Sequence, residues 1–432
     1  MAVSILYFIM DKDIEMARWE LAGRLQVRET LTESTSQIRN LSGVNVKISG
    51  TTTGTKWREW KTVRTDAEGR FSLVMDKGNS RRRFKIKVFL EDQFLRVMRP
   101  RFLRVARDQG EKESAPIEVL RDENKRSGKN IDFGVIILDD QAVNNVERRH
   151  GCRAALWYTA KHISDELLSH DSWLGFDEQI TIVYPSVWMT SGMGNRARIA
   201  SDRFGSTPSY NRTDVIHEIM HIWNYQHNSG TTDWVTAGWN GTHNRQERPN
   251  IAFHEGFAQW ASRSLQHLLW SGGQMLPANK FWVSSNNNGP EVMSLDEFER
   301  SDFCVESALS FLMHPTPNLL TFGSATASSN GTARNVAITL APAISIAMIC
   351  PRQSLDFWEV LQSFRGGQHE SWPTDWDVGS GDFGLLRFFD RLSDIYPTQF
   401  PQESKDTYIR VLDPTTEEEF TDNCSPATRL IR

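Results

Sequence analysis

Apolar and polar residues alternate along the first third of the chain, with the period of two that half-buried β-strands require. The first such segment, residues 19–29, reads WELAGRLQVRE. Further strands are expected at residues 44–49, 82–90, 94–98 and 131–138, and within residues 61–75, where a turn at 66–69 divides the segment. Residues 110–130 are charged and lack a period, so we expect a loop or linker there. Because several half-buried strands need two facing sheets to bury their apolar sides, this part predicts an antiparallel β-sandwich.

After about residue 142 the apolar period becomes helical. Helices are expected at residues 150–168, 213–226, 250–270, 295–313, 335–348, 355–364 and 382–395. Residues 179–184 are the short buried strand expected in this part. The predicted fold class is therefore α+β and multidomain, with an N-terminal antiparallel β-sandwich followed by a mainly α-helical domain that contains a small sheet.

The expected organisation has four segments, and a length of 432 residues is typical of two or three domains. The segments are an N-terminal extension (1–18), a β-sandwich accessory domain (19–140), a second and larger domain (141–400) and a C-terminal tail (401–432).

Composition excludes several classes of protein. With 39% hydrophobic and 24% charged residues, the chain is neither collagenous nor globally disordered. The net charge of −5 divides unevenly, because residues 1–150 hold 29 Lys+Arg against 22 Asp+Glu and the remainder holds 20 against 32. The densest basic run, at residues 81–83, is short and has acidic neighbours, so we expect no nucleic-acid partner.

The compartment is predicted only by default. The sequence contains no stretch of 18 or more apolar residues, so it predicts no transmembrane helix. The N-terminal apolar run has no preceding positive region and no small-residue cleavage site, so a cytoplasmic location is expected and secretion stays open. The four cysteines are widely spaced and allow either two disulfides or four thiols; they are Cys152, Cys304, Cys350 and Cys424.

The strongest chemical signal is the sequence HEIMH at residues 217–221. Residues four apart lie one turn above each other on a helix, so His217 and His221 can bind one metal ion. Glu218 lies about 100° further around the axis, where it can reach a water on the open side of that ion.

Two imidazoles need a third protein ligand to form a catalytic zinc site. Glu255 is the candidate, 34 residues beyond His221 in the sequence FHEGFAQW. Gly256 beside it permits close approach of another backbone. Two antiparallel helices would bring these residues together, and two histidines with one glutamate form a catalytic rather than a closed structural set for one Zn²⁺ ion.

These motifs carry a resemblance to known families. The sequence HEIMHIWN followed by EGFAQW resembles the gluzincin zinc metallopeptidases. Within that group, the two motifs are most similar to those of aminopeptidase N-like and glycyl aminopeptidase-like enzymes. The resemblance implies that His217, His221 and Glu255 bind zinc, that Glu218 is the general base, and that residues 141–400 form the metallopeptidase domain. LSGVNV at 41–46 and TDAEGRF at 65–71 are similar to transthyretin-like or carboxypeptidase regulatory-like sandwiches, which implies an accessory module.

One part of the motif set departs from the aminopeptidase pattern. Such enzymes carry a GxMEN-like strand whose glutamate holds the free amine of the substrate. This chain has Gly192, Met193, Gly194 and Asn195 at a comparable distance before His217, with no acidic residue among them. An endopeptidase is therefore slightly favoured, and this segment remains a candidate edge strand for an extended peptide or protein substrate.

Several other side chains are candidates for stabilising the transition state or supporting a ligand. Tyr225, one helical turn beyond His221, is expected to pack against its neighbours rather than stabilise the transition state. Glu306, an acidic residue in an apolar helix, either supports a ligand histidine or lies at the surface. His254 is expected to be a rim or core histidine rather than a ligand. The remaining open candidates are His227, His243, His314 and Tyr396.

Two other functions remain open. The domain could be a catalytically silent gluzincin-like module that binds peptides or proteins, or a zinc hydrolase of a small amide or ester. The oligomeric state is unknown from the sequence.

Overall fold

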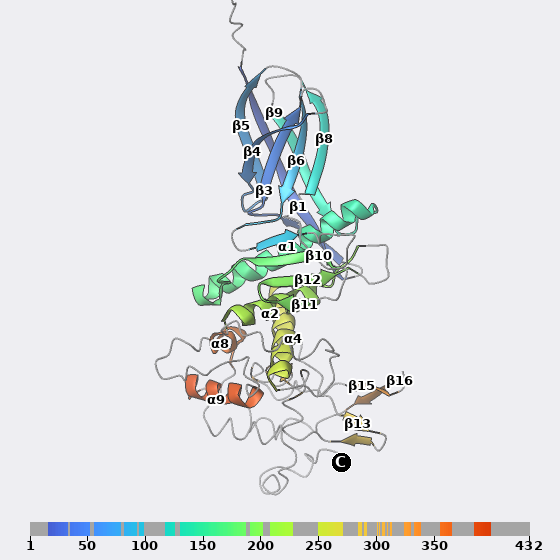
Figure 1. Ribbon diagram of the computed structural model, residues 1–432, viewed down its shortest axis with the longest axis vertical. Helices are drawn as coiled ribbons and strands as arrows, with labels where there is room; N and C mark the ends of the chain where they lie inside the picture. Colours follow the sequence, from blue (N-terminus) through green and yellow to red (C-terminus); the bar gives the residue numbers. More distant parts are fainter. Residues whose placement is uncertain are drawn as a thin grey trace, which may run out of the picture. The chain divides into compact units, whose positions relative to one another are not determined.

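The computed structural model has mixed α and β structure with several antiparallel sheets (Figure 1). It describes residues 16–32, 35–51, 56–78, 82–92, 95–98, 117–125, 130–186, 191–201, 208–227, 249–270, 284–286, 289–291, 300, 302, 305–306, 309, 312, 324–329, 332–337, 355–364 and 384–398. No helix in these ranges is both long and apolar enough to span a membrane.

The chain divides into two compact units, the first comprising residues 1–158, 181–187 and 200–210 and the second comprising residues 159–180, 188–199 and 211–432. The expected extension and tail lie almost wholly outside the described residues, and the expected domain boundaries stay predictions.

The first unit contains two four-stranded sheets. One has β1 (Met16–Thr32) paired with β2 (Thr35–Asn40), β5 (Arg70–Gly78) and β9 (Asn130–Asp139). The other has the order β4-β3-β6-β8 and is antiparallel throughout, with β3 (Asn45–Thr51), β4 (Arg58–Arg64), β6 (Arg82–Phe89) and β8 (Ile117–Lys125). Strands β1, β3, β4, β5, β6 and β9 follow the alternating segments of the sequence.

Two features of these sheets differ from the expectation. β9 pairs with β1 in parallel, so the unit is not purely antiparallel. β1 and β9 are far apart in the chain, with other strands between them, so no tight turn joins the two and forces them to run antiparallel. The expected loop at residues 110–130 was wrong for β8, because that strand is held by backbone pairing with β6, which charged side chains do not prevent.

Aromatic rings from both sheets are in contact in the core of the unit. Trp19 of β1 lies 5.6 Å from Phe84 of β6, and Phe84 lies 6.4 Å from Phe133 of β9, measured between ring centroids. Trp19 and Phe84 are fully buried. Burial of these large apolar surfaces stabilises the association of the two sheets.

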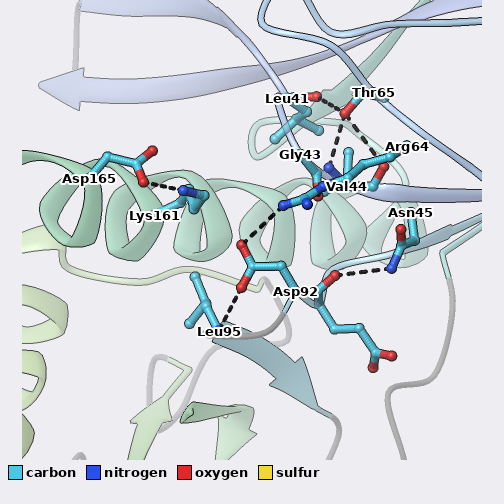
Figure 2. Close-up of polar contacts among 11 residues, drawn as sticks. Leu41, Gly43, Val44, Asn45, Arg64, Thr65, Asp92, Leu95, Lys161 and Asp165 are labelled. Carbon is cyan, nitrogen blue, oxygen red and sulfur yellow. Dashed lines mark hydrogen bonds and ion pairs between the residues drawn. The ribbon is translucent and has the colours of Figure 1, made fainter. Parts of the chain in front are cut away.

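The two sequence segments that resemble a regulatory sandwich are hydrogen-bonded to each other (Figure 2). Thr65 donates its hydroxyl to the carbonyl of Leu41 at 2.7 Å and accepts the amide of Val44 at 3.0 Å. Arg64 donates to the carbonyl of Gly43 at 2.9 Å. These contacts hold the residues just before β3 against the end of β4, and they thereby set the register of the β3–β4 hairpin.

The first unit also contains paired strands β7 (Leu95–Met98) and β10 (Ile180–Ser186), together with helix α1 (Asn145–His170) as far as Tyr158. Both strands and the helix match the predicted segments. The tail of α1 leads into the second unit and the short 3₁₀ turn η1 (Ser172–Leu174).

The second unit contains the hairpin of β11 (Ser191–Met193) and β12 (Arg196–Ala200), followed by α2 (Arg212–His227), α4 (Pro249–Trp270), α8 (Phe357–Gln362) and α9 (Leu385–Ile395). These helices match predicted segments. Two further hairpins are β13 (Ser284–Asn286) with β14 (Gly289–Glu291), and β15 (Ser324–Ser329) with β16 (Thr332–Ala337).

The helix expected at residues 335–348 was wrong where it overlaps β16, and its other residues lie outside the described ranges. Asn330 and Gly331 separate the two strands in the sequence, and Asn-Gly is a strong signal for a two-residue hairpin turn. The apolar run that follows obscured this signal.

An aromatic cluster forms the core around α2 and α4. Trp223 stacks on Phe257 at 5.9 Å, and Phe364 lies 4.8 Å from Phe257 and 5.0 Å from Phe388. Trp223 and Trp260 are almost fully buried, so both are core residues.

Candidate metal centre

Helix α2 presents the HEIMH sequence because its start is well capped. The side chain of Asn211 accepts the amide of Thr213 at 3.0 Å, and its carbonyl accepts the amide of Val215. Asp214 in the first turn suits the positive end of the helix dipole. The helix therefore begins one turn before His217, and His217 and His221 share one face.

Helix α4 packs against α2, and the contacts between them show that the two helices run antiparallel. Thr213 near the start of α2 is hydrogen-bonded to Gln266 near the end of α4, whereas Asn224 near the end of α2 contacts His254 near the start of α4. The arrangement follows the expectation from the spacing of the two motifs.

Gly256 allows a third segment to approach α4. A Cβ built on Gly256 would lie 2.4 Å from the carbonyl oxygen of Asp302 and 2.6 Å from the Cβ of Val305. Real Cβ atoms do not tolerate such distances. The expectation that this glycine permits close approach of another backbone is therefore confirmed.

The donor atoms of His217, His221 and Glu255 converge. The two Nε2 atoms are 2.9 Å apart, and each lies 3.2 Å from Oε2 of Glu255. Ligands at about 2.0–2.1 Å around a tetrahedral zinc ion lie about 3.3 Å from one another. The three donors are therefore spaced as three corners of such a tetrahedron, and the residues present fit a bound divalent metal.

The electrostatic environment favours a charged carboxylate at Glu255. Burial raises the pKa of this carboxyl, but the two imidazoles, through charge and hydrogen bonds, hold it well below its usual range. The side chains of His217 and His221 are 12% and 6% exposed. A largely buried group of two imidazoles and a carboxylate is a typical donor set for Zn²⁺, and it would also accept other transition metals.

Glu218 lies on α2 directly after the first ligand histidine and is buried. It comes from the same rigid helix as both imidazoles, so its position relative to them is fixed by helix geometry. Its assignment as the general base stays a prediction.

His227 caps the C-terminal end of α2, where its ring is hydrogen-bonded to backbone and not to the candidate metal ligands. Its ring nitrogens lie 2.8 Å and 2.7 Å from the carbonyl oxygens of Trp223 and Trp173, and the ring stacks on Trp223. Both ring nitrogens are thus engaged with backbone, which fixes the ring. Tyr396 is likewise tied to backbone, because its hydroxyl donates to the carbonyl of Glu359 at 3.0 Å.

Glu306 is buried and not at the surface. Its carboxylate pairs with Arg263 of α4 at 2.9 Å, two turns beyond Glu255. The surface alternative was therefore wrong, and a supporting role for Glu306 at a ligand histidine stays a prediction.

The candidate edge strand lies beside α2 in the second unit. Gly192 and Met193 belong to β11, and in the antiparallel pairing with β12 they lie opposite Ala197 and Arg196. Gly194, with a φ of +54°, forms the turn, and a Cβ there would contact the ring of Tyr225 at 3.9 Å. Tyr225 thus packs near the hairpin turn. Substrate binding by this segment stays a prediction.

Gln226 attaches the hairpin turn to α2. Its amide donates to Asn195 at 2.8 Å and to the carbonyl of Glu178 at 3.2 Å, while its carbonyl accepts the amides of Asp177 and Glu178. Both donors and the acceptor of the Gln226 side chain are used. Sequence reasoning missed this residue, because a glutamine at the end of a helix carries no signal of its own.

Asn224 and His254 form a buried contact beside the candidate metal ligands. His254 was expected either at the rim or in the core, and it is buried in the core; its partner Asn224 was missed. The remaining candidates, His243 and His314, lie outside the described residues.

Comparisons with known proteins add little to this geometry. No family model and no curated protein sequence matches the chain. A 9R-lipoxygenase from Cyanothece PCC8801 is a structural match with 15% sequence identity and a TM-score of 0.19, covering 39% of this chain and 27% of the lipoxygenase chain. The chain thus spans about a quarter of that protein, and a likeness this low carries no argument.

Proposed function

We propose that the protein is a zinc-dependent peptidase of the gluzincin type, hydrolysing peptide bonds with a metal-activated water. The observation that carries this proposal is the convergence of Nε2 of His217, Nε2 of His221 and Oε2 of Glu255 within 3.2 Å of one another, with Glu218 on the same helix. Two histidines and a glutamate leave a fourth position for water in catalytic zinc sites.

The proposal assigns a role to each side chain. His217, His221 and Glu255 would hold one Zn²⁺, which supplies a bound water of lowered pKa and a positive charge for the scissile carbonyl. Glu218 accepts the proton of the attacking water as the new C–O bond forms. It then gives that proton to the leaving amine as the C–N bond breaks, so that water is added across the peptide bond.

The proposal extends to the architecture and the substrate. The two sheets of the first unit, joined by Trp19, Phe84 and Phe133, support an accessory β-sandwich that precedes a mainly helical peptidase domain in the chain. The partner is a peptide or protein, for which β11 would provide backbone hydrogen bonds. Internal cleavage is favoured because no acidic residue occurs among Gly192–Asn195 to hold a free amine.

The test is cleavage of a mixed peptide library by zinc-loaded wild type, read by mass spectrometry, with Glu218→Gln as the matched control. Internal cuts made by the wild type and absent from Glu218→Gln would support the proposal. Trimming from the N-terminus would replace the endopeptidase assignment with an aminopeptidase.

The same preparations separate the two alternatives. If zinc-loaded wild type cuts no peptide but hydrolyses small esters or amides, the small-molecule hydrolase is favoured. If it hydrolyses neither and retains peptides on a column, the silent binding module is favoured.

A further inference from the structure

In the part of the chain that the structure describes, polar side-chain contacts join helices α2 and α4 at three levels, in addition to the stacking of Trp223 on Phe257. Thr213 and Gln266 are hydrogen-bonded at one level, and the three ligand donors meet at the next. The third level, on the other side of the ligands, is the contact between Asn224 and His254.

The Asn224–His254 contact is short and buried. The side-chain Nδ2 of Asn224 donates to Nδ1 of His254 at 2.5 Å, and the two residues are 0% and 7% exposed. His254 immediately precedes the candidate ligand Glu255, and Asn224 follows His221 by three residues on the same helix.

We infer that the hydrogen bond between Asn224 and His254 positions the Glu255 carboxylate against the two imidazoles and thereby sets the metal affinity. This inference rests on the proposed metal site. The two helices are connected through residues 228–248, so local chain geometry does not fix their spacing. A buried polar contact does fix it, because displacing one partner leaves polar atoms without water or a bond.

The position of the contact makes it effective. A metal site tolerates errors of only about 0.2 Å in its donor distances. Because α4 is a rigid helix, a contact made by the residue next to Glu255 limits the movement of its carboxylate more than a contact eleven residues away. Gln266 provides such a distant contact and is therefore the matched control.

The test measures the zinc dissociation constant of the full-length chain by competition with a chromophoric chelator. Asn224→Ala should weaken zinc binding by about 10–100-fold, the range seen when residues that orient metal ligands are removed. Gln266→Ala breaks another contact between the same helices and should change the constant by less than about threefold. The absorption spectrum of the cobalt-loaded protein should change in Asn224→Ala only.

A second pair of variants applies if Asn224→Ala does not fold. His254→Asn places an amide oxygen near the position of Nδ1 and keeps an acceptor for Asn224, whereas His254→Leu removes it. Zinc affinity should be retained in His254→Asn and weakened in His254→Leu by about as much as in Asn224→Ala. In the double variant Asn224→Ala with His254→Leu, the losses should not add, because both changes remove the same bond.

Equal weakening in Asn224→Ala and Gln266→Ala, or no weakening in Asn224→Ala and His254→Leu, would overturn the inference. Wild type that binds one zinc ion tightly but cleaves no peptide would overturn the proposed peptidase function and leave the positioning role supported by the variant series. Wild type that binds no zinc would overturn both.

Discussion

Gly256 lies beside the third candidate ligand, where helix α4 is approached by another segment. Substitution by alanine has two opposing effects. Alanine stabilises a helix by about 1 kcal/mol relative to glycine. The added Cβ, however, would lie 2.4 Å from the carbonyl oxygen of Asp302 and 2.6 Å from the Cβ of Val305, and neither atom can rotate away.

The steric effect should exceed the helix propensity. Relieving a 2.4 Å contact to ordinary van der Waals distance requires about 1 Å of movement between the two segments, and overpacking of this kind costs about 1–3 kcal/mol. A net loss of about 1–2 kcal/mol is expected if the clash lies in the upper part of that range. The same movement displaces Glu255 from the imidazoles, so zinc binding should weaken by about tenfold or more.

Thermal unfolding of the metal-free protein and zinc competition measure the two effects separately. Gly256→Ala should lower the melting temperature by roughly 2–8 °C, and Gly256→Val should lower it further. An unchanged or raised melting temperature in Gly256→Ala, together with wild-type zinc affinity, would refute the packing argument.

Three further predictions concern other parts of the molecule. Gln226→Ala should release the β11–β12 turn from α2 and raise KM for peptides without changing zinc affinity; an unchanged KM would exclude a role for this contact in substrate binding. Burial raises the pKa of the Cys152 thiol to about 11, so alkylation by iodoacetamide at pH 8 should be about 100-fold slower than for an ordinary thiol; a normal rate in the folded protein would contradict this. Burial also raises the pKa of the Asp140 carboxyl, although hydrogen bonds from Thr30 and Tyr210 lower it in part. A carboxyl whose pKa is raised in the folded state contributes stability below its unfolded pKa of about 3.9, and this stability is lost as the pH rises through the folded value. In urea titrations, wild type should therefore lose stability relative to Asp140→Asn between acidic and neutral pH, and equal dependence on pH in the two proteins would disprove the shift.

The sequence predicted the parts of the site that depend on local periodicity. His217 and His221 are one helical turn apart, and the glycine after Glu255 indicated close packing at α4. The alternating strands of the first unit were predicted for the same reason, since each apolar period reflects one buried face.

The contacts that depend on long-range pairing were not predictable in this way. β8 is a charged segment made into a strand by its pairing with β6, and β9 pairs in parallel with β1, which is far from it in the chain. Asn224 and His254 are 30 residues apart in the chain, and their contact depends on the register of helices α2 and α4, so neither residue type alone indicates a partner.

The central claim is that His217, His221 and Glu255 hold one catalytic metal ion. It is tested most directly by the zinc content per chain of wild type, His217→Ala, Glu255→Gln and Glu218→Gln after equilibration with equal zinc and gel filtration. We expect one zinc per chain in wild type and in Glu218→Gln, with zinc lost from His217→Ala and strongly reduced in Glu255→Gln. Equal zinc content in all four proteins, or none in wild type, would contradict it.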